Sequence, residues 1–572
     1  MEKIIKLRKI LKNKNIDGYL IPKNDEFFSE YVDNYSDRLK FISNFSGSFG
    51  FALIFKNENY LFVDGRYTLQ AKIQSKKFFK IQTIPKEMPD KILKDKVLKI
   101  GFNPKLFSKK TLDIFFGKTK CKLIPIKEDL IDMVWIRKGI KKISKFYYLK
   151  DSDVGQTSGK KITLILKNLK KKRADYQFIT SSENNAWLLN IRGKDSNYTP
   201  LPHCHILLDK KRNIYFFCDL RKISVEFKKK FKKVNFYDFS KIELFLSRLT
   251  DNKFIIDKNS CSMFFENIIS KNNTILKELD PIYDFKSIKT LKEINNIKKA
   301  HIYDGAALTK YLFWIKRNYK KLRITEISGE NKLLKFRKMN KNFKFQSFPT
   351  ISSVGPNGSI VHYKANKKTN RVLKEGEIYL VDSGGQYNFG TTDVTRTISL
   401  NNNNSRIKNI FTRVLKGHIA VTSFKLNKFT KGLKIDIAAR KYLKQVNLDY
   451  EHGTGHGVGY FLNVHEGPHA ISSNNRITLK KGMIVSNEPG YYEKNKFGIR
   501  IENLIYIKKS KKKFFFDNFT MAPIDRCLID KSLLRVDELS WINSYHKKVF
   551  NRLKKFMNKK EIGELRVACS AI

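Results

Sequence analysis

The chain is poor in cysteine and lacks the cysteine patterns that mark two common classes of small domain. Only six cysteines occur among 572 residues. They stand apart, without the CxxC pairing of a structural zinc site or the density of a disulfide scaffold, at Cys121, Cys204, Cys218, Cys261, Cys527 and Cys569. This usage favours a reducing compartment.

Long uncharged apolar runs are also missing. None approaches the ~20 residues that a membrane-spanning helix needs. Residues 1–21 interrupt their apolar positions with Lys and Arg at helical spacing, so they lack the unbroken apolar core of a signal peptide. We therefore expect a soluble protein of the cytoplasm.

Acidic residues are scarce beside basic ones. The chain has 54 Asp and Glu against 114 Lys and Arg, which gives a formal net charge of +60. Polyanions bind clustered cations through counterion release, so such an excess can indicate a nucleic-acid partner. The densest lysine clusters, however, lie far apart in the sequence, at 170–173, 228–233 and 508–513. A solvated basic surface is therefore favoured over a nucleic-acid site.

The first half of the chain contains one unit twice. In the first copy a strand-like run opens at Asp17 and the unit continues to YLFVDGR at 60–66. In the second copy the run opens at Asp175 and continues to YFFCDLR at 215–221. Each copy alternates β-branched or aromatic strands with lysine-rich amphipathic helices, the pattern of a layered α/β (α+β) domain.

The length of the chain exceeds what one hydrophobic core can fill, and two to four domains are expected. A polar stretch near residue 150 separates the two copies, and a long helical pattern begins near Lys286. The chain ends in an amphipathic pattern of one or two helices, after which residues 558–572 carry no functional signal. We predict domains over residues 1–150, 151–285 and 286–572.

The chemistry is expected in residues 350–507, where two hairpins bring acids together. In residues 377–400 two strand-like runs flank a turn. If the turn is centred between Tyr387 and Asn388, Asp382 faces Asp393. Opposed Cβ atoms lie only about 4.5–5.5 Å apart, and like charges there are destabilising. A cation is therefore expected between these carboxylates.

The second hairpin repeats the arrangement. A three-residue turn at Lys494–Lys496 would place Glu488 opposite Glu502. Both registers depend on the turn positions, because a bulge would shift them. Between the hairpins, residues 452–469 hold four histidines among several glycines. That much glycine argues against a helix and for backbone packed closely around a ligand.

One imidazole with four carboxylates is a hard, oxygen-rich set that suits manganese or a similar divalent ion better than structural zinc. Two ions sharing it would lie about 3.5–4 Å apart, as in hydrolytic two-metal sites. Each acid alone is more often a turn former. Arg396 and Arg500 could also neutralise the acids without metal, or orient them as metal ligands. Taken together, the residues favour the metal site.

These residues carry a resemblance to a known family. NGSIVHYKA, YLVDSGGQY, GTTDVTRT, GTGHGVGYFLNVHEGP, NEPGYY and GIRIEN resemble the signatures of the pita-bread metallopeptidases, and among them the long, three-domain Xaa-Pro aminopeptidases. FVDGRY, AWLLNIRG and SWINSYHKKV resemble other parts of the same family. The resemblance implies two creatinase-like N-terminal α/β domains followed by a pita-bread catalytic domain, a homodimer, and hydrolysis of the N-terminal Xaa-Pro bond of peptides.

The resemblance also implies site residues. Five would hold two divalent metal ions, with manganese (Mn2+) expected: Asp382, Asp393, His456, Glu488 and Glu502. Asp393 and Glu502 would bridge the ions, and Glu488 would also shuttle a proton. His362, His452 and His465 would be catalytic and contact substrate, the last two as candidates to stabilise the oxyanion. Arg500 would brace an acid, and His469 has no implied role.

Three other functions remain open at this point. An Xaa-Pro dipeptidase and a methionine aminopeptidase would share the five ligands. The doubled N-terminal region argues against the methionine enzyme, and GTGHGVGYFLNVHEGP argues against the dipeptidase. A catalytically silent, peptide-binding pita-bread protein is disfavoured because the ligand set is intact.

Overall fold

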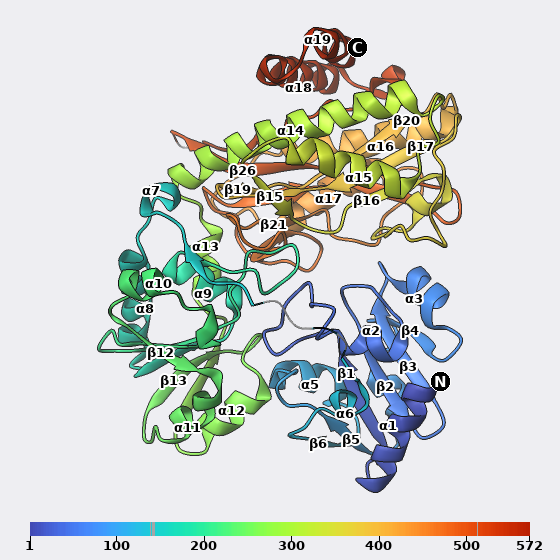
Figure 1. Ribbon diagram of the computed structural model, residues 1–572. Helices are drawn as coiled ribbons and strands as arrows, with labels where there is room; N and C mark the ends of the chain where they lie inside the picture. Colours follow the sequence, from blue (N-terminus) through green and yellow to red (C-terminus); the bar gives the residue numbers. More distant parts are fainter. Residues whose placement is uncertain (138, 140–142, 512) are drawn as a thin grey trace. The chain divides into compact units, whose positions relative to one another are not determined.

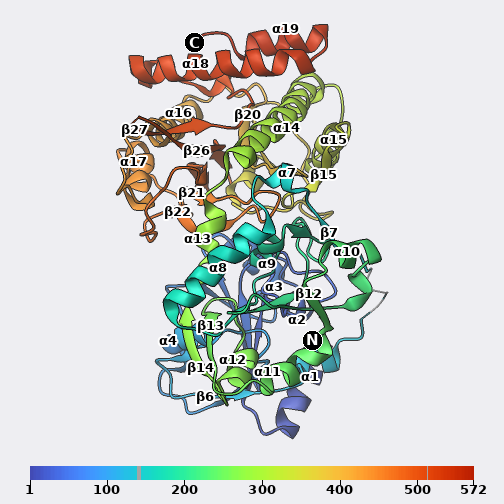
Figure 2. The same ribbon diagram turned by 90° about the vertical axis from the view of Figure 1, so that its left-hand side faces the viewer.

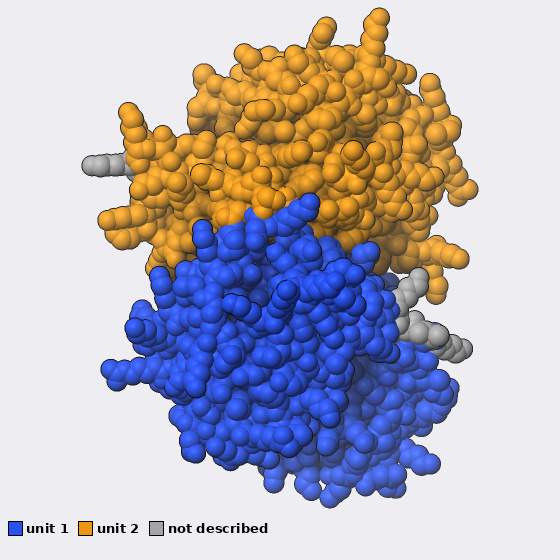
Figure 3. Space-filling model, turned by 60° about the vertical axis from the view of Figure 1, so that its left-hand side comes forward, with its two compact units in different colours: residues 1–151, 156–283 blue, residues 152–155, 284–572 orange. Residues whose placement is uncertain are grey.

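The computed structural model describes residues 1–137, 139, 143–511 and 513–572. It divides into two compact units (Figure 3). The first unit comprises residues 1–151 and 156–283, and the second comprises residues 152–155 and 284–572.

The first unit contains the same six-stranded sheet twice within its described residues. The strand orders are β4-β3-β2-β1-β5-β6 and β12-β11-β10-β8-β13-β14. In both sheets the antiparallel strands are central and the outer pairs are parallel. The predicted repeat is thus confirmed. The strands are β1 (Gly18–Pro22), β2 (Phe51–Phe55), β3 (Asn59–Asp64), β4 (Lys80–Ile84), β5 (Lys99–Phe102), β6 (Lys122–Pro125), β8 (Tyr176–Ile179), β10 (His205–Asp209), β11 (Ile214–Cys218), β12 (Val234–Asp238), β13 (Lys253–Asp257) and β14 (Thr274–Glu278).

Helices, several of them lysine-rich and amphipathic, accompany these sheets, as α8 (Ser158–Lys172) illustrates. It begins where the Thr157 side chain accepts a hydrogen bond from the Lys160 amide, and it buries Ile162, Ile165 and Leu169 at three- and four-residue spacing. The other helices of eight residues or more are α1 (Glu2–Asn13), α3 (Thr68–Ser75), α5 (Lys109–Phe116), α9 (Ser182–Leu189) and α12 (Met263–Ser270). Shorter ones are α2 (Arg38–Ser43), α4 (Pro89–Leu93), α6 (Leu130–Val134), α10 (Val225–Lys230) and α11 (Ile242–Ser247).

The second unit surrounds several short sheets with helices. Its long first helix, α14 (Leu291–Asn318), starts at a capping box formed by Thr290 and Glu293. The tail forms two helices, α18 and α19, which lie beside α14 (Figures 1 and 2). The helices after α14 are α15 (Glu326–Lys338), α16 (Ser405–Thr422), α17 (Gly432–Lys444), α18 (Val536–Leu553) and α19 (Lys559–Ala568).

The strands of this unit position the acidic residues. They form three-stranded sheets β15-β18-β19 and β16-β17-β20, a five-stranded sheet β22-β21-β23-β26-β27 and the pair β24-β25. The strand bounds are β15 (Phe343–Gln346), β16 (Ile351–Val354), β17 (Ile378–Ser383), β18 (Gly385–Tyr387), β19 (Gly390–Thr391), β20 (Val394–Ser399), β21 (Gly455–Gly457), β22 (Glu466–Ile471), β23 (Ile484–Asn487), β24 (Gly490–Glu493), β25 (Phe497–Arg500), β26 (Asn503–Ser510) and β27 (Lys513–Asn518).

Among the described helices of the whole chain, none combines the length and apolar character that a bilayer crossing requires.

Candidate metal centre

The first hairpin has a different register from the predicted one. Asp382 in β17 pairs with Thr395 in β20, so the prediction that it faces Asp393 is wrong. Tyr387 still belongs to a strand and pairs with Gly390, because its fully buried ring and its hydroxyl, 2.9 Å from Asp304, anchor it there. Each residue of the first strand therefore pairs with a residue two positions later in the chain than predicted. Side chains alternate with period two, so Asp393 remains on the face predicted for it.

The second hairpin has the predicted register. Gly490 pairs with Arg500 across β24 and β25, which places the turn at Lys494–Lys496. Asn487 pairs with Asn503 across β23 and β26 in the same register. Between these two ladders the pairing breaks, and Glu488 and Glu502 occupy matching positions in the break.

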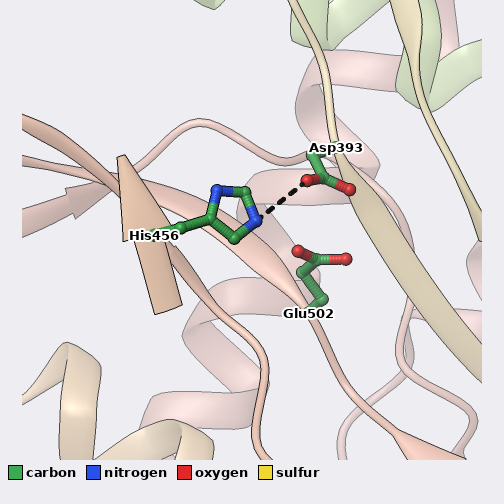
Figure 4. A group of neighbouring side chains, drawn as sticks. All are labelled: Asp393, His456 and Glu502. Carbon is green, nitrogen blue, oxygen red and sulfur yellow. Dashed lines mark ion pairs between the residues drawn. The ribbon is translucent and has the colours of Figure 1, made fainter. Parts of the chain in front are cut away.

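His456 on β21 points its ring toward these acids. Its Nδ1 lies 2.9 Å from the Gly457 carbonyl oxygen, which selects the tautomer that leaves the Nε2 lone pair free to bind a cation. Nε2 lies 3.5 Å from Asp393 Oδ2 and 3.3 Å from Glu488 Oε1. Asp393, His456 and Glu502 point toward one another, and each offers one ligand atom within 4.8 Å of the others (Figure 4).

The glycines around His456 pack against backbone. A Cβ at Gly455 would lie 1.9 Å from the Ser486 carbonyl oxygen, and one at Gly457 would lie 2.3 Å from that of Glu466. The predicted close approach is therefore real, but it is made by neighbouring strands of the same sheet. It lets β21 pair tightly enough to hold the imidazole in place.

Burial makes the acidic cluster unfavourable without a cation. Burial, followed by the charges of Glu502 and Asp382, raises the pKa of the Asp393 carboxyl far above its usual range. Burial and the nearby Asp382 also raise the pKa of Glu502, and burial raises that of Glu488 to about 7. Among the described residues, Asp382 Oδ1 is buried without a hydrogen-bond partner. Buried carboxylates that repel one another beside a preset imidazole lone pair fit a divalent cation.

Arg500 and Thr395 link the carboxylates of Asp382 and Glu502 through hydrogen bonds. Arg500 Nη2 donates to Asp382 Oδ2 at 2.8 Å, and its Nε donates to Thr395 Oγ1 at 3.0 Å. The Thr395 hydroxyl then donates to Glu502 Oε2 at 2.8 Å. Sequence reasoning missed Thr395, although the correct register would have placed it directly opposite Asp382.

The two arginines considered for neutralising the acids behave differently. Arg396 donates through Nη1 to the carbonyl oxygens of Thr395 and Glu502, and through Nη2 to the Tyr545 hydroxyl. It therefore braces backbone, whereas Arg500 pairs with a carboxylate.

The other histidines named in the sequence analysis are His362, His452, His465 and His469. His452 is half-buried, and its Nε2 is 2.9 Å from the Tyr492 hydroxyl, which also accepts a hydrogen bond from Arg500. Sequence reasoning gave Tyr492 no role. His465 is exposed, with its ring centroid 4.2 Å from that of His456.

His362 is half-buried in a turn just after the 3-10 helix η3 (Gly355–Ser359). His469, to which the sequence assigned no role, is a core residue. Its Nε2 lies 2.7 Å from the Ile484 carbonyl oxygen, and burial lowers its pKa to about 4.

Known protein families match four segments of the chain. Residues 295–509 match metallopeptidase family M24, and residues 513–572 match the C-terminal region of peptidase M24. Residues 3–134 and 140–293 each match the creatinase/prolidase N-terminal domain. A protein of Laccaria bicolor named "Probable Xaa-Pro aminopeptidase P" is 36% identical over 582 residues, covering 96% of this chain and 90% of that protein. The chain belongs to metallopeptidase family M24.

Two further proteins match this M24 metallopeptidase along nearly its whole length, and a third matches part of it. Xaa-Pro aminopeptidase 1 of Dictyostelium discoideum is 36% identical, covering 99% of this chain and 95% of that protein. The crystal structure of an X-prolyl aminopeptidase from Caenorhabditis elegans, described as a cytosolic enzyme with a di-nuclear active site, matches with a TM-score of 0.95 and 30% identity, covering 100% and 99% of the two chains. The prolidase of Pyrococcus furiosus matches with a TM-score of 0.51 and 25% identity, covering 62% of this chain and 98% of its own.

These findings confirm the predicted architecture. The M24 metallopeptidase has two creatinase-like N-terminal domains followed by a pita-bread domain.

Proposed function

We propose that this metallopeptidase removes the first residue from peptides whose second residue is proline. The observation that carries the proposal is the convergence of Asp393, His456 and Glu502 on one buried point. It lies in a chain that aligns from end to end with Xaa-Pro aminopeptidases.

We propose that two divalent ions bind there. Asp393 and Glu502 would bridge them, Asp382 would complete one coordination sphere, and His456 with Glu488 would complete the other. Four carboxylates against one imidazole favour manganese over softer ions. When bound, such ions lower the pKa of water and polarise the scissile carbonyl.

Glu488 is proposed to move the proton. Beside the ions its side chain would be a carboxylate, which can accept a proton from the attacking water and release it to the proline nitrogen, which must be protonated to leave. Ser486 Oγ donates to Glu488 Oε1 at 3.0 Å and orients the carboxylate for both transfers.

The histidines are proposed to bind substrate. His452 or His465 would donate to the oxyanion that develops on the scissile carbonyl, and His362 would contact the peptide. His452 is held by Tyr492, which also contacts Arg500. The position of His452 is thereby linked to that of Asp382, which pairs with the same arginine.

An Xaa-Pro dipeptidase is the main competing function. The prolidase match covers only 62% of this chain, whereas the X-prolyl aminopeptidase match covers all of it, which favours the aminopeptidase.

The decisive experiment compares Xaa-Pro-Yaa, Xaa-Pro and Xaa-Ala-Yaa peptides with manganese-loaded protein, before and after chelation. Cleavage restricted to Xaa-Pro-Yaa and longer Xaa-Pro peptides, lost on chelation and in Asp393→Asn, is expected. Cleavage of the dipeptide alone would contradict the proposal. No cleavage by metal-reconstituted protein would favour a silent peptide binder.

We further propose a cytoplasmic homodimer. The location agrees with the matched enzyme from Caenorhabditis elegans, described as cytosolic. Size-exclusion chromatography with light scattering should give twice the chain mass of 67.0 kDa. A monomer at micromolar concentration would overturn the dimer.

A further inference from the structure

Glu326, the first residue of α15, has a completely buried side chain that forms no ion pair with any described residue. A buried carboxylate is costly unless hydrogen bonds replace its hydration. All of those bonds come from one stretch of chain, residues 354–371, here called the 354–371 segment.

Both carboxylate oxygens of Glu326 accept hydrogen bonds from this segment. Oε1 accepts from the Val354 amide at 2.9 Å and from Asn357 Nδ2 at 3.0 Å. Oε2 accepts from Asn357 Nδ2 at 3.0 Å, the Tyr363 hydroxyl at 2.7 Å and the Arg371 amide at 2.9 Å. One side chain thus ties together the two ends and the middle of the segment.

The 354–371 segment contains one proposed site residue and contacts the strand that leads to another. His362 lies within it, next to Tyr363. Its 3-10 helix packs against β25, where Gly358 and Gly498 touch through their backbones: a Cβ on Gly498 would lie 1.8 Å from the Gly358 carbonyl oxygen. β25 ends at Arg500, which holds Asp382.

We infer that Glu326 is a positioning residue, which holds the 354–371 segment so that His362 meets the substrate. The inference rests on the proposed function in giving His362 a substrate contact. The acceptor pattern explains why a carboxylate is needed. Each oxygen faces a backbone N–H that cannot turn away, Val354 on one side and Arg371 on the other. Glutamine, in either orientation, would set its own NH2 against one of them.

Hydrogen exchange of the full-length, metal-free protein tests the first half of this inference. In Glu326→Gln the amides of Val354 and Arg371 should exchange about tenfold faster or more, while amides within α16 keep their protection. Glu377→Gln is the matched control, because Glu377 pairs with the Arg371 side chain at 2.8 Å from a partly exposed position. It should leave the Val354 amide unchanged. Unchanged exchange in Glu326→Gln would overturn the inference.

Kinetics on an Xaa-Pro-Yaa peptide test the second half. Glu326→Gln should lower kcat/KM by about 10–100-fold with unchanged metal content by elemental analysis, and His362→Ala should lower kcat/KM to a similar extent. The double variant should be no worse than His362→Ala alone, because both act through one side chain. Additive losses would mean that Glu326 acts elsewhere, and would overturn the role.

Two controls keep these outcomes separate. If Glu326→Gln does not fold, Tyr363→Phe removes a single donor to the same carboxylate, and it should show the same changes at smaller size. If the wild-type enzyme cleaves no Xaa-Pro peptide, the proposed function fails, while the exchange experiment still decides whether Glu326 holds the segment.

Discussion

Lys289 and Glu466 form a fully buried ion pair inside the second unit, although 177 residues separate them in the chain. Lys286 lies 3.6 Å from the other oxygen of the same carboxylate and is equally buried. Lys289 precedes α14, and Glu466 directly follows His465. The pair therefore fastens the start of the long helix to the chain that carries a proposed substrate-binding histidine.

Removing the Glu466 charge should destabilise the second unit. Glu466→Gln would remove the counter-charge of the buried Lys289 ammonium group, and losing one partner of a buried pair costs about 3–5 kcal/mol. Urea unfolding should show a correspondingly lower midpoint. Lys496→Ala, which removes an exposed pair with Glu493, should change the free energy of unfolding by less than about 1 kcal/mol. Equal effects of the two substitutions would contradict this account.

The Thr395 hydroxyl should matter for metal binding. Thr395→Val removes the donor to Glu502 and the acceptor for Arg500, so metal affinity should fall by about 10–100-fold. Thr395→Ser keeps the hydroxyl and should bind nearly as well as wild type. Calorimetric titration with manganese measures both, and similar affinities for the valine and serine variants would refute the role.

The metal-free protein should lose stability as pH rises. Burial raises the pKa of Glu488 from 4.5 to about 7, so the folded state keeps a proton that the unfolded state has released. The resulting stabilisation is complete below pH 4.5 and is lost as pH rises through 7. Calorimetric unfolding should therefore show a steeper decline for wild type than for Glu488→Gln over this range. If wild type and Glu488→Gln lost stability equally over this pH range, the role given to the Glu488 proton would be wrong.

Tyr545 should stabilise the contact between the C-terminal helix α18 and Arg396, which holds backbone near the metal centre. Its hydroxyl accepts from Arg396 at 2.8 Å and donates to the Ala522 carbonyl oxygen at 2.7 Å. Tyr545→Phe leaves both groups with fewer partners in the interior, which should cost about 1–3 kcal/mol in thermal unfolding experiments. A variant as stable as wild type would show that Arg396 is satisfied without it.

The sequence was sufficient where local chemistry determines structure. The turn at Lys494–Lys496 was predictable because Asn495 tolerates the left-handed backbone, with φ of 59°, that this turn needs. The first hairpin was displaced because Tyr387 looks like a turn residue in the sequence, yet its contact with Asp304 keeps it in a strand. That contact joins distant parts of the chain and leaves no local pattern.

The same limit applies to the residues that support the metal centre. Arg396 and Arg500 look equivalent in the sequence, since each lies two or three residues from an acid. Only the packing of the strands shows that one binds carbonyl oxygens and the other a carboxylate. Glu326 is 45 residues from Arg371, so its role could not be read from spacing.

The shared register on both sides of Glu488 and Glu502 limits how this part of the chain can change in length. Deleting one residue from either strand between the break and the turn would shift the pairing of β24 with β25 by one residue relative to that of β23 with β26. The side chains of the shortened strand would then point to the opposite face. Residues added or removed at Lys494–Lys496 lie beyond the last paired residues, Glu493 and Phe497, and leave the ladder as it is. Loop grafts or tags are therefore tolerable at the tip of this hairpin and not within its stem.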